Sequence, residues 1–321
     1  MTLYEDPDFP SEFVNPPCNK IVWRRPRDIV HLPKFFGASY CPVTQTPEQH
    51  FERRKDIKAR TSVFFSIAVA SLTKKIRYFR KVVPEQSFQN NYTGKFRFKF
   101  FEEDVQKVIE IDDRLPTSVS AQPLFSDCVN DAFWFPLLEK AYAKFRGGYD
   151  SIATGLPVEA FYHLTGQWPE WFDNGAGTKL PYSPSGMYHK IKMLILKNAL
   201  VVCKQNDCRG NNEEHGTGFV VIGTQTEKCR CNNGNMEDRQ FVRVRHPSGS
   251  IDNKLKNQMS ISEIFDEKGE GLIAVERFLE QIQCVYFMDL IDTLERIPGI
   301  DPFCPLILDN SDFQKHRCKK H

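Results

Sequence analysis

The sequence predicts an α+β fold in which a helix-rich first half is followed by a sheet-rich second half. Helical patterns fall before residue 170, and β-like patterns dominate after residue 203. A Gly-, Pro- and Ser-rich stretch at 173–186 separates the two and is the best internal boundary. With 321 residues, the chain is long enough for about two structural units and a large apolar core.

These patterns divide the chain into four parts. Residues 1–35 are rich in proline and aromatic residues, and we expect an irregular N-terminal arm there. Residues 36–180 form the predicted helical subdomain, residues 181–300 the β-rich subdomain, and residues 301–321 a C-terminal tail. Its last residues, 315–321, are basic, and we expect them to be exposed to solvent.

In the first half, 62–73 is an apolar run without Gly or Pro that is too long for a typical strand, which favours a buried helix. The basic cluster 74–81 follows it and is interpreted as a solvated helix end. The segment 95–101 alternates Lys or Arg with Phe, which predicts a strand. A second strand is expected over 105–116.

Further helices are predicted at 133–147 and 156–166. Pro136 suits the first turn of the former, and Gly147 supplies its stop. The segment 187–203 is interpreted as a helix that runs into a strand.

Charge and hydropathy exclude several classes of function. The 43 Lys and Arg residues nearly balance the 41 Asp and Glu residues, so nothing in the overall charge favours nucleic acid or a membrane surface. No apolar run approaches the roughly 18 residues of a transmembrane helix. The acidic N-terminus is unlike a secretory signal, so we expect a reducing, cytoplasmic location and no disulfides among the ten cysteines.

Several short blocks together resemble the protease core of the calpains, the calcium-dependent cysteine endopeptidases. They are YEDPDFP, WRRPRDI, SIAVASLT, YTGKFRFKFF, FWFPLLEKAYAKFRGGYDSI, TGFVVIG, VRVRHPSG and GEGLIAVERFL, in the order of the family. The resemblance covers about residues 4–290. It implies a papain-like first subdomain and a β-sandwich-like second one.

The same resemblance assigns the catalytic positions. A cysteine protease needs a thiolate at a helix N-terminus, a histidine that holds its proton and a polar residue that orients the histidine. The nucleophile position of the family falls on Val63, its histidine position on Thr217 and its orienting asparagine position on His246. The glutamine of its oxyanion hole falls on Ile57, and the tryptophan after the asparagine falls on Ser248. We therefore expect no proteolysis.

A displaced triad built from Ser62 and His215 is disfavoured. One residue on a helix rotates a side chain by about 100°, and two residues on a strand move it by about 6–7 Å. Catalysis tolerates errors of about 1 Å.

The resemblance also implies two calcium sites, here weakened. Glu139 and Glu270 match ligand positions, and Asp252 is a possible further remnant. Pro42 and Lys268 align where the family has aspartates, so we expect weak or lost calcium binding and count no confident cofactor.

Zinc is a less favoured alternative. Four cysteines and one histidine flank the loop 204–216, but the C-x2-C pairs typical of zinc sites are missing. The five residues are Cys203, Cys208, His215, Cys229 and Cys231. We interpret the four cysteines as unpaired loop thiols.

The sequence thus predicts a calpain-like pseudoprotease that acts as a binding or regulatory module, holding protein partners or protease substrates without cleaving them. The first alternative is an active calcium-dependent cysteine endopeptidase. The second is a structural protein whose basic segment 74–81 contacts nucleic acid or lipid.

Overall fold

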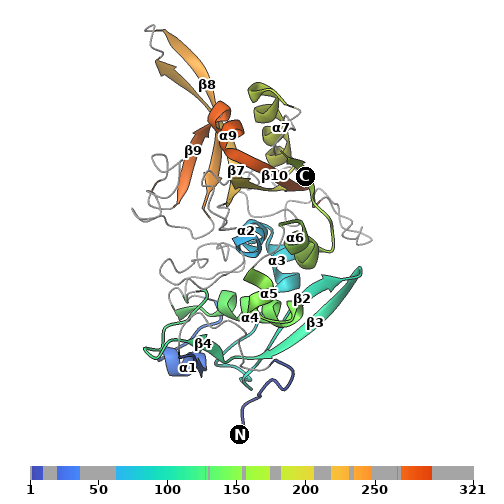
Figure 1. The fold of residues 1–321 in the computed structure, drawn as a ribbon, viewed down its shortest axis with the longest axis vertical. Helices are drawn as coiled ribbons and strands as arrows, with labels where there is room; N and C mark the ends of the chain where they lie inside the picture. Colours follow the sequence, from blue (N-terminus) through green and yellow to red (C-terminus); the bar gives the residue numbers. More distant parts are fainter. Residues whose placement is uncertain are drawn as a thin grey trace, which may run out of the picture.

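The computed structural model of the chain describes residues 2–9, 20–36, 63–126, 128, 131–153, 157–173, 182–205, 218–230, 235–246, 266 and 269–290. Its two halves are stacked along the long axis (Figure 1), with most helices in one half and a large sheet in the other. The α+β class and the order of a helix-rich half before a sheet-rich half are confirmed.

Within the described residues, the first half contains a hairpin and six helices. Its elements are β1 (Val22–Arg24), α1 (Pro26–Ile29), α2 (Val63–Leu72), α3 (Ile76–Val82), β2 (Lys95–Glu102), β3 (Val105–Asp112), β4 (Leu115–Thr117), α4 (Trp134–Arg146), α5 (Tyr149–Ala153) and α6 (Pro157–Thr165). The helix predicted over 62–73 is confirmed as α2, and the predicted strand pair is the antiparallel hairpin β2–β3. Helix α4 ends at Gly147, whose φ of 91° is the left-handed conformation that favours glycine at a helix end.

Two predictions for this half need correction. The arm is not irregular throughout, because β1 pairs with β4 and α1 follows directly. The basic segment 74–81 is not the end of α2 but a turn followed by the separate helix α3, and Lys75 is buried. Both corrections depend on tertiary contacts that a local pattern does not carry.

The second half is built on one six-stranded antiparallel sheet with the order β5-β10-β6-β7-β8-β9. Its elements are β5 (Glu170–Asp173), α7 (Pro184–Leu196), β6 (Leu200–Gln205), β7 (Gly218–Arg230), β8 (Met236–Arg245), β9 (Glu270–Ala274), α9 (Val275–Gln281) and β10 (Ile282–Met288). The described strands form one sheet covered by helices rather than two facing sheets. Strand β5 lies before the predicted boundary at residue 180 yet joins this sheet.

The central strands are buried on both faces. On β6, Val201 and Cys203 pack into the core under α7 and α9, whereas Leu200 and Val202 pack into the core of the first half. Alternate residues of a strand point to opposite faces, so β6 carries an unbroken apolar run rather than an alternating one. The sheet therefore joins the two halves through apolar contacts.

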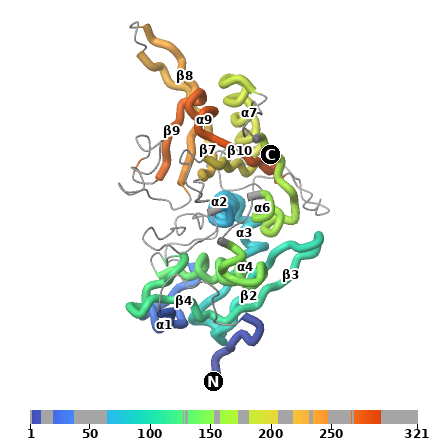
Figure 2. The backbone as a smooth tube through the Cα atoms, in the orientation of Figure 1, coloured from blue at the N-terminus to red at the C-terminus, as the bar shows by residue number. Residues whose placement is uncertain are grey.

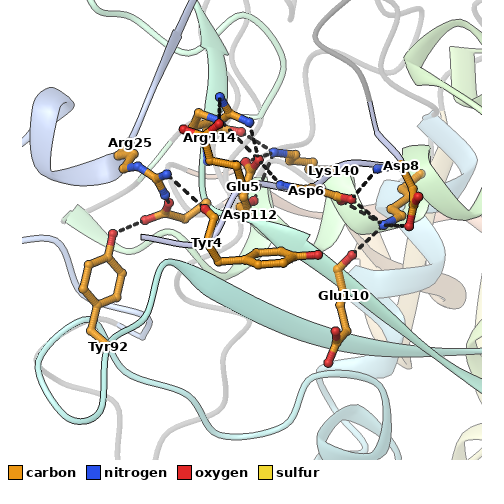
Figure 3. A network of polar contacts seen from close by, with 12 residues as sticks. Tyr4, Glu5, Asp6, Asp8, Arg25, Tyr92, Glu110, Asp112, Arg114 and Lys140 are labelled. Carbon is orange, nitrogen blue, oxygen red and sulfur yellow. Dashed lines mark hydrogen bonds and ion pairs between the residues drawn. The ribbon is translucent and has the colours of Figure 1, made fainter. Parts of the chain in front are cut away.

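The N-terminal segment is fixed to the first half by buried charges (Figure 3). Asp6 is buried, accepts two hydrogen bonds from Lys144 Nζ at 2.8 and 2.9 Å, and donates its backbone N–H to Asp112 at 2.9 Å. Lys140 Nζ lies 2.6 Å from Asp112 Oδ1, and both side chains are only 2% exposed. Asp113 binds Arg25 and Tyr92. Figure 2 shows this segment at the end of the molecule remote from the sheet.

Burial and ion pairing act in opposite directions on this network. Burial opposes ionisation of Asp112, but Arg114 and Lys140 hold its pKa well below the usual range. Burial lowers the pKa of Lys140 even though Asp112 opposes that change. A buried ammonium with a carboxylate partner and two backbone acceptors is consistent with a charged pair.

Candidate functional site

Helix α2 begins at Val63, the residue to which the family resemblance assigns the nucleophile. Its residues are almost all apolar and lack Gly and Pro, and Phe65 and the run from Ile67 to Ala70 are buried. Such a helix can only be stable when it is packed on every side. It lies between the helices of the first half and the strands β6 and β7, at the junction of the two halves (Figure 1).

The start of β7 touches α2 directly. A Cβ added to Gly218 would collide with Ile67 Cδ1 and would lie 2.8 Å from the backbone oxygen of Cys203. Val63 is the first residue of α2 and stands about one helical turn before Ile67. The helix start and the strand start are thus brought to the same junction. Thr217, the histidine position, precedes Gly218 but lies outside the described residues.

His246 follows the last residue of β8. It is 8% exposed, its ring meets Phe219 edge to face with ring centroids 6.0 Å apart, and its backbone N–H donates to Gly269 at 2.8 Å. Phe219 belongs to β7, next to Gly218. The residue to which the family resemblance assigns the orienting position is therefore a ring packed against β7.

Other positions singled out in the sequence lie outside the described residues. They are Ile57, Ser62, His215 and Ser248 of the catalytic assignments, and Pro42, Asp252 and Lys268 of the calcium assignments. Their assignments stay predictions.

Glu270 does not fit a calcium site. Its Oε1 accepts from Arg245 Nε at 3.0 Å and also from Nη2 of the same side chain, and its Oε2 accepts from Arg243 Nη2 at 2.7 Å. Burial opposes ionisation, but the two arginines lower the pKa of Glu270 below its ordinary value. Both carboxylate oxygens of Glu270 are already bound by arginine side chains. A calcium ion would therefore have to displace two guanidinium groups.

Glu139 of α4 has a different role. It is 1% exposed, and its Oε2 accepts the backbone N–H of Ser126 at 2.9 Å. This contact ties the loop before α4 to the helix. Across the described ranges, no group of three or more His, Cys, Asp and Glu side chains lies close enough to hold a metal ion.

The five-ligand zinc alternative is wrong for the two thiols that are described. Cys203 pairs with Phe219, and Cys229 lies ten residues further along β7, paired with Glu237. Ten residues of strand span about 33 Å, whereas two ligands of one zinc ion lie within about 4 Å of each other. Cys203 is buried, and burial raises the pKa of its thiol to about 12. Cys208, His215 and Cys231 lie outside the described residues.

Sequence reasoning missed the arginines that hold Glu270. Arg243 and Arg245 alternate on β8 and therefore share a face of the sheet. The alternation was visible in the sequence, but the partner was not, because it depends on the register that places Arg245 opposite Glu270. The contact between Gly218 and Ile67 left no local signal at all.

A buried helix packed against the first residue of an antiparallel strand, with His246 directly after the neighbouring strand, agrees with the papain-like core that the sequence predicts. Comparison with known proteins defines the family. The family model "Calpain family cysteine protease" matches residues 4–263. The chain belongs to the calpain family.

Individual calpains are also similar in sequence to this chain. The chain is 28% identical to the calpain-2 catalytic subunit of Bos taurus over 271 residues, which is 78% of this chain and 35% of that protein. It is 36% identical to calpain clp-4 of Caenorhabditis elegans over 180 residues (54% of this chain, 24% of the relative). It is 32% identical to calpain-A of Drosophila melanogaster over 210 residues (63% and 23%). The matched region thus spans 35% or less of these curated relatives.

Of the helices that the structure describes, none is long and apolar enough to cross a membrane.

Proposed function

We propose that this chain is a calpain-like pseudoprotease, a protease core that binds protein partners or substrates without cleaving them. The observation that carries the proposal is that α2 begins at Val63, where the family resemblance expects the nucleophilic cysteine. A helix N-terminus lowers the pKa of a thiol and stabilises the thiolate, but an isopropyl group has nothing to ionise.

The surroundings of α2 support the same proposal. The described thiol on β6, that of Cys203, belongs to the core under α7 and α9, on the sheet face opposite α2. Its raised pKa also disfavours a thiolate. His246 packs against Phe219 in place of an orienting amide. Neither residue offers a substitute for the missing nucleophile.

Inactivity is tested with the purified chain, casein and a short peptide substrate, with calcium or with a chelator. We expect no cleavage above the blank in any condition. Calcium-dependent cleavage that a thiol-reactive epoxide abolishes would instead establish an active cysteine endopeptidase.

Repair variants sharpen this test. Val63→Cys alone should stay inactive, because a thiol near its ordinary pKa of about 8.5 lacks a base and an oxyanion donor. The triple variant Val63→Cys, Thr217→His, His246→Asn should recover weak activity at most, since Ile57 and Ser248 remain. Peptide hydrolysis by Val63→Cys alone would mean that another residue, such as His215, serves as the base.

The binding role needs its own assay. An excess of this chain should slow the cleavage of casein by an active calpain catalytic subunit if the two compete for substrate. Heat-unfolded chain at the same concentration is the control, because it could act as a competing substrate. A native chain that leaves the rate unchanged while binding no casein would contradict the proposed competition.

A further inference from the structure

Helix α7 has a buried face and an outer face of different chemistry. Met187, Tyr188, Ile191 and Leu194 are buried against the sheet. The helix has 13 residues and begins with Ser183 as N-cap, whose side chain accepts from the backbone N–H of Gly186 at 3.2 Å. Figures 1 and 2 show α7 on the outer side of the sheet.

Two long apolar side chains stand on the outer face. Met193 is 53% exposed and Leu196 is 71% exposed. At about 100° per residue, their mean direction lies opposite the mean direction of the four buried residues. They are three residues apart and are therefore neighbours on the helix surface. We call Met193 and Leu196 the α7 crest.

Lysines border the crest on both sides. At the same rotation per residue, Lys192 lies on one side and Lys190 and Lys197 lie on the other, and the helix has no acidic residue. Lys192 Nζ lies 6.0 Å from the ring centroid of Tyr188, and Lys190 Nζ lies 5.0 Å from that of Phe287. Within the described part of the chain, none of the three lysines forms an ion pair.

We propose that the α7 crest docks onto an anionic lipid surface. The Lys190 ammonium lies over Phe287 of the sheet, so the apolar tips stand between Lys192 and Lys197. This arrangement matches the boundary between acyl chains and headgroups, where methylene stems stay in apolar surroundings and ammonium groups reach phosphates. Charge favours this occupant, because α7 carries no acidic residue and its lysines complement anionic headgroups. The helix lies on this surface and does not span it.

The neighbouring helix limits the strength of this association. Helix α9 packs beside α7 and exposes Glu276, Arg277 and Glu280, a net charge of −1 against the three lysines. Binding should therefore be moderate and sensitive to salt, because screening weakens contacts between exposed charges. This inference is independent of whether the chain is a pseudoprotease.

The test is cosedimentation of the full chain with lipid vesicles. The vesicles contain phosphatidylcholine alone or with about 30% phosphatidylserine, in about 0.05 M or about 0.5 M salt. We expect binding to the anionic vesicles at low salt, little binding at high salt and none to phosphatidylcholine. Met193→Gln/Leu196→Gln and, separately, Lys192→Glu/Lys197→Glu should each weaken binding by about tenfold or more.

Two control variants make comparable changes at other exposed positions. Leu32→Gln/Val119→Gln removes apolar side chains that are 63% and 60% exposed, and Arg77→Glu/Arg80→Glu reverses exposed charges on α3. Both should bind as the parent does. Glutamine has a high helix propensity, so Met193→Gln/Leu196→Gln should keep the parent's unfolding midpoint.

Three outcomes would overturn the proposal. Absence of binding that depends on phosphatidylserine is the first. If the lysine variant loses binding but the glutamine variant does not, the lysines attract anions without insertion of the crest. If the crest variants instead abolish self-association in sedimentation velocity, the crest is a contact between copies of the chain.

Discussion

Charge is distributed very differently in two buried regions of this molecule. Around the N-terminal segment, the side chains of Asp6, Asp112 and Asp113 are at most 2% exposed and are paired with Lys144, Lys140 and Arg25. At the junction of α2 with β6 and β7, most described contacts are apolar or made by backbone, as where Gly218 meets Ile67, and the Lys204 ammonium lies 5.5 Å from the ring centroid of Phe64. The first region retains ionisable groups and the second has few.

The difference in buried charge has consequences for stability and for chemistry. Buried ion pairs are costly to desolvate and are strongly destabilising when one partner is removed, so they lock segments in one arrangement. A protease needs ionisable groups at the junction instead, with pKa values suited to proton transfer. Among the described residues, buried ion pairs gather where they fix the N-terminal segment, whereas the described contacts of α2 with β6 and β7 include no ion pair.

The largest expected effect comes from breaking the buried pair. Lys140→Met should lower the free energy of unfolding by about 3–5 kcal/mol, because it leaves Asp112 and two backbone carbonyls without their donor. Urea unfolding measures the loss. Lys107→Met, which removes an exposed pair with Glu102, is the control and should cause no clear change. Equal effects of the two variants would contradict the contrast between buried and exposed pairs.

The second effect is pH dependence from His163. Burial lowers its pKa from 6.5 to about 4, and its Nδ1 lies 2.9 Å from the Tyr142 hydroxyl. Between these pH values the unfolded chain binds the proton more readily, so the free energy of unfolding should fall by up to about 1.4 kcal/mol per pH unit on acidification, about 3 kcal/mol in all.

His163→Gln should flatten this dependence, measured as urea midpoints between pH 7 and pH 4. His189→Gln, at an exposed histidine, should leave the slope unchanged. A parent slope that survives in His163→Gln would mean that other groups cause it.

The third effect probes the apolar junction. Gly218→Ala should cost about 1–3 kcal/mol, because the added methyl group collides with Ile67 and with the backbone of Cys203. Gly223→Ala, on the same strand, is the matched control, since its Cβ would meet only Arg243 Cβ at 3.9 Å. If thermal unfolding ranks both variants alike, α2 does not pack on β7 as tightly as described.

The smallest effect concerns Glu270 and calcium. Glu270→Gln should cost less than about 1 kcal/mol, because Arg243 and Arg245 are partly exposed. Calcium at 100 times its Kd would add about 2.7 kcal/mol, but we expect the same unfolding midpoint with calcium or chelator. A midpoint that rises with calcium, and no longer does so in Glu270→Gln or Glu139→Gln, would reveal a working site.

Local patterns predicted the elements that are stabilised locally. The length of α2, the alternation in β2 and the stop at Gly147 were all visible in the sequence. The strand β1 was missed because its three residues are held by β4, more than 90 positions later. At the site, motif spacing located Val63 at a helix start and His246 near a strand end. The ring contact of His246 and the arginine partners of Glu270 could not be predicted, because both depend on how strands align.

The position of β10 has a consequence for synthesis of the chain. This strand is the last described in the sequence, yet it lies between β5 and β6. When β6, β7 and β8 have left the ribosome, β5 still has no neighbouring strand, and the sheet stays split until residue 288 emerges. Antiparallel pairing over such separations is slow and leaves strand edges exposed meanwhile. The nascent protein therefore passes through a stage in which β5 and β6 lack the strand that lies between them, and their edges are exposed to wrong pairing and need the protection of chaperones.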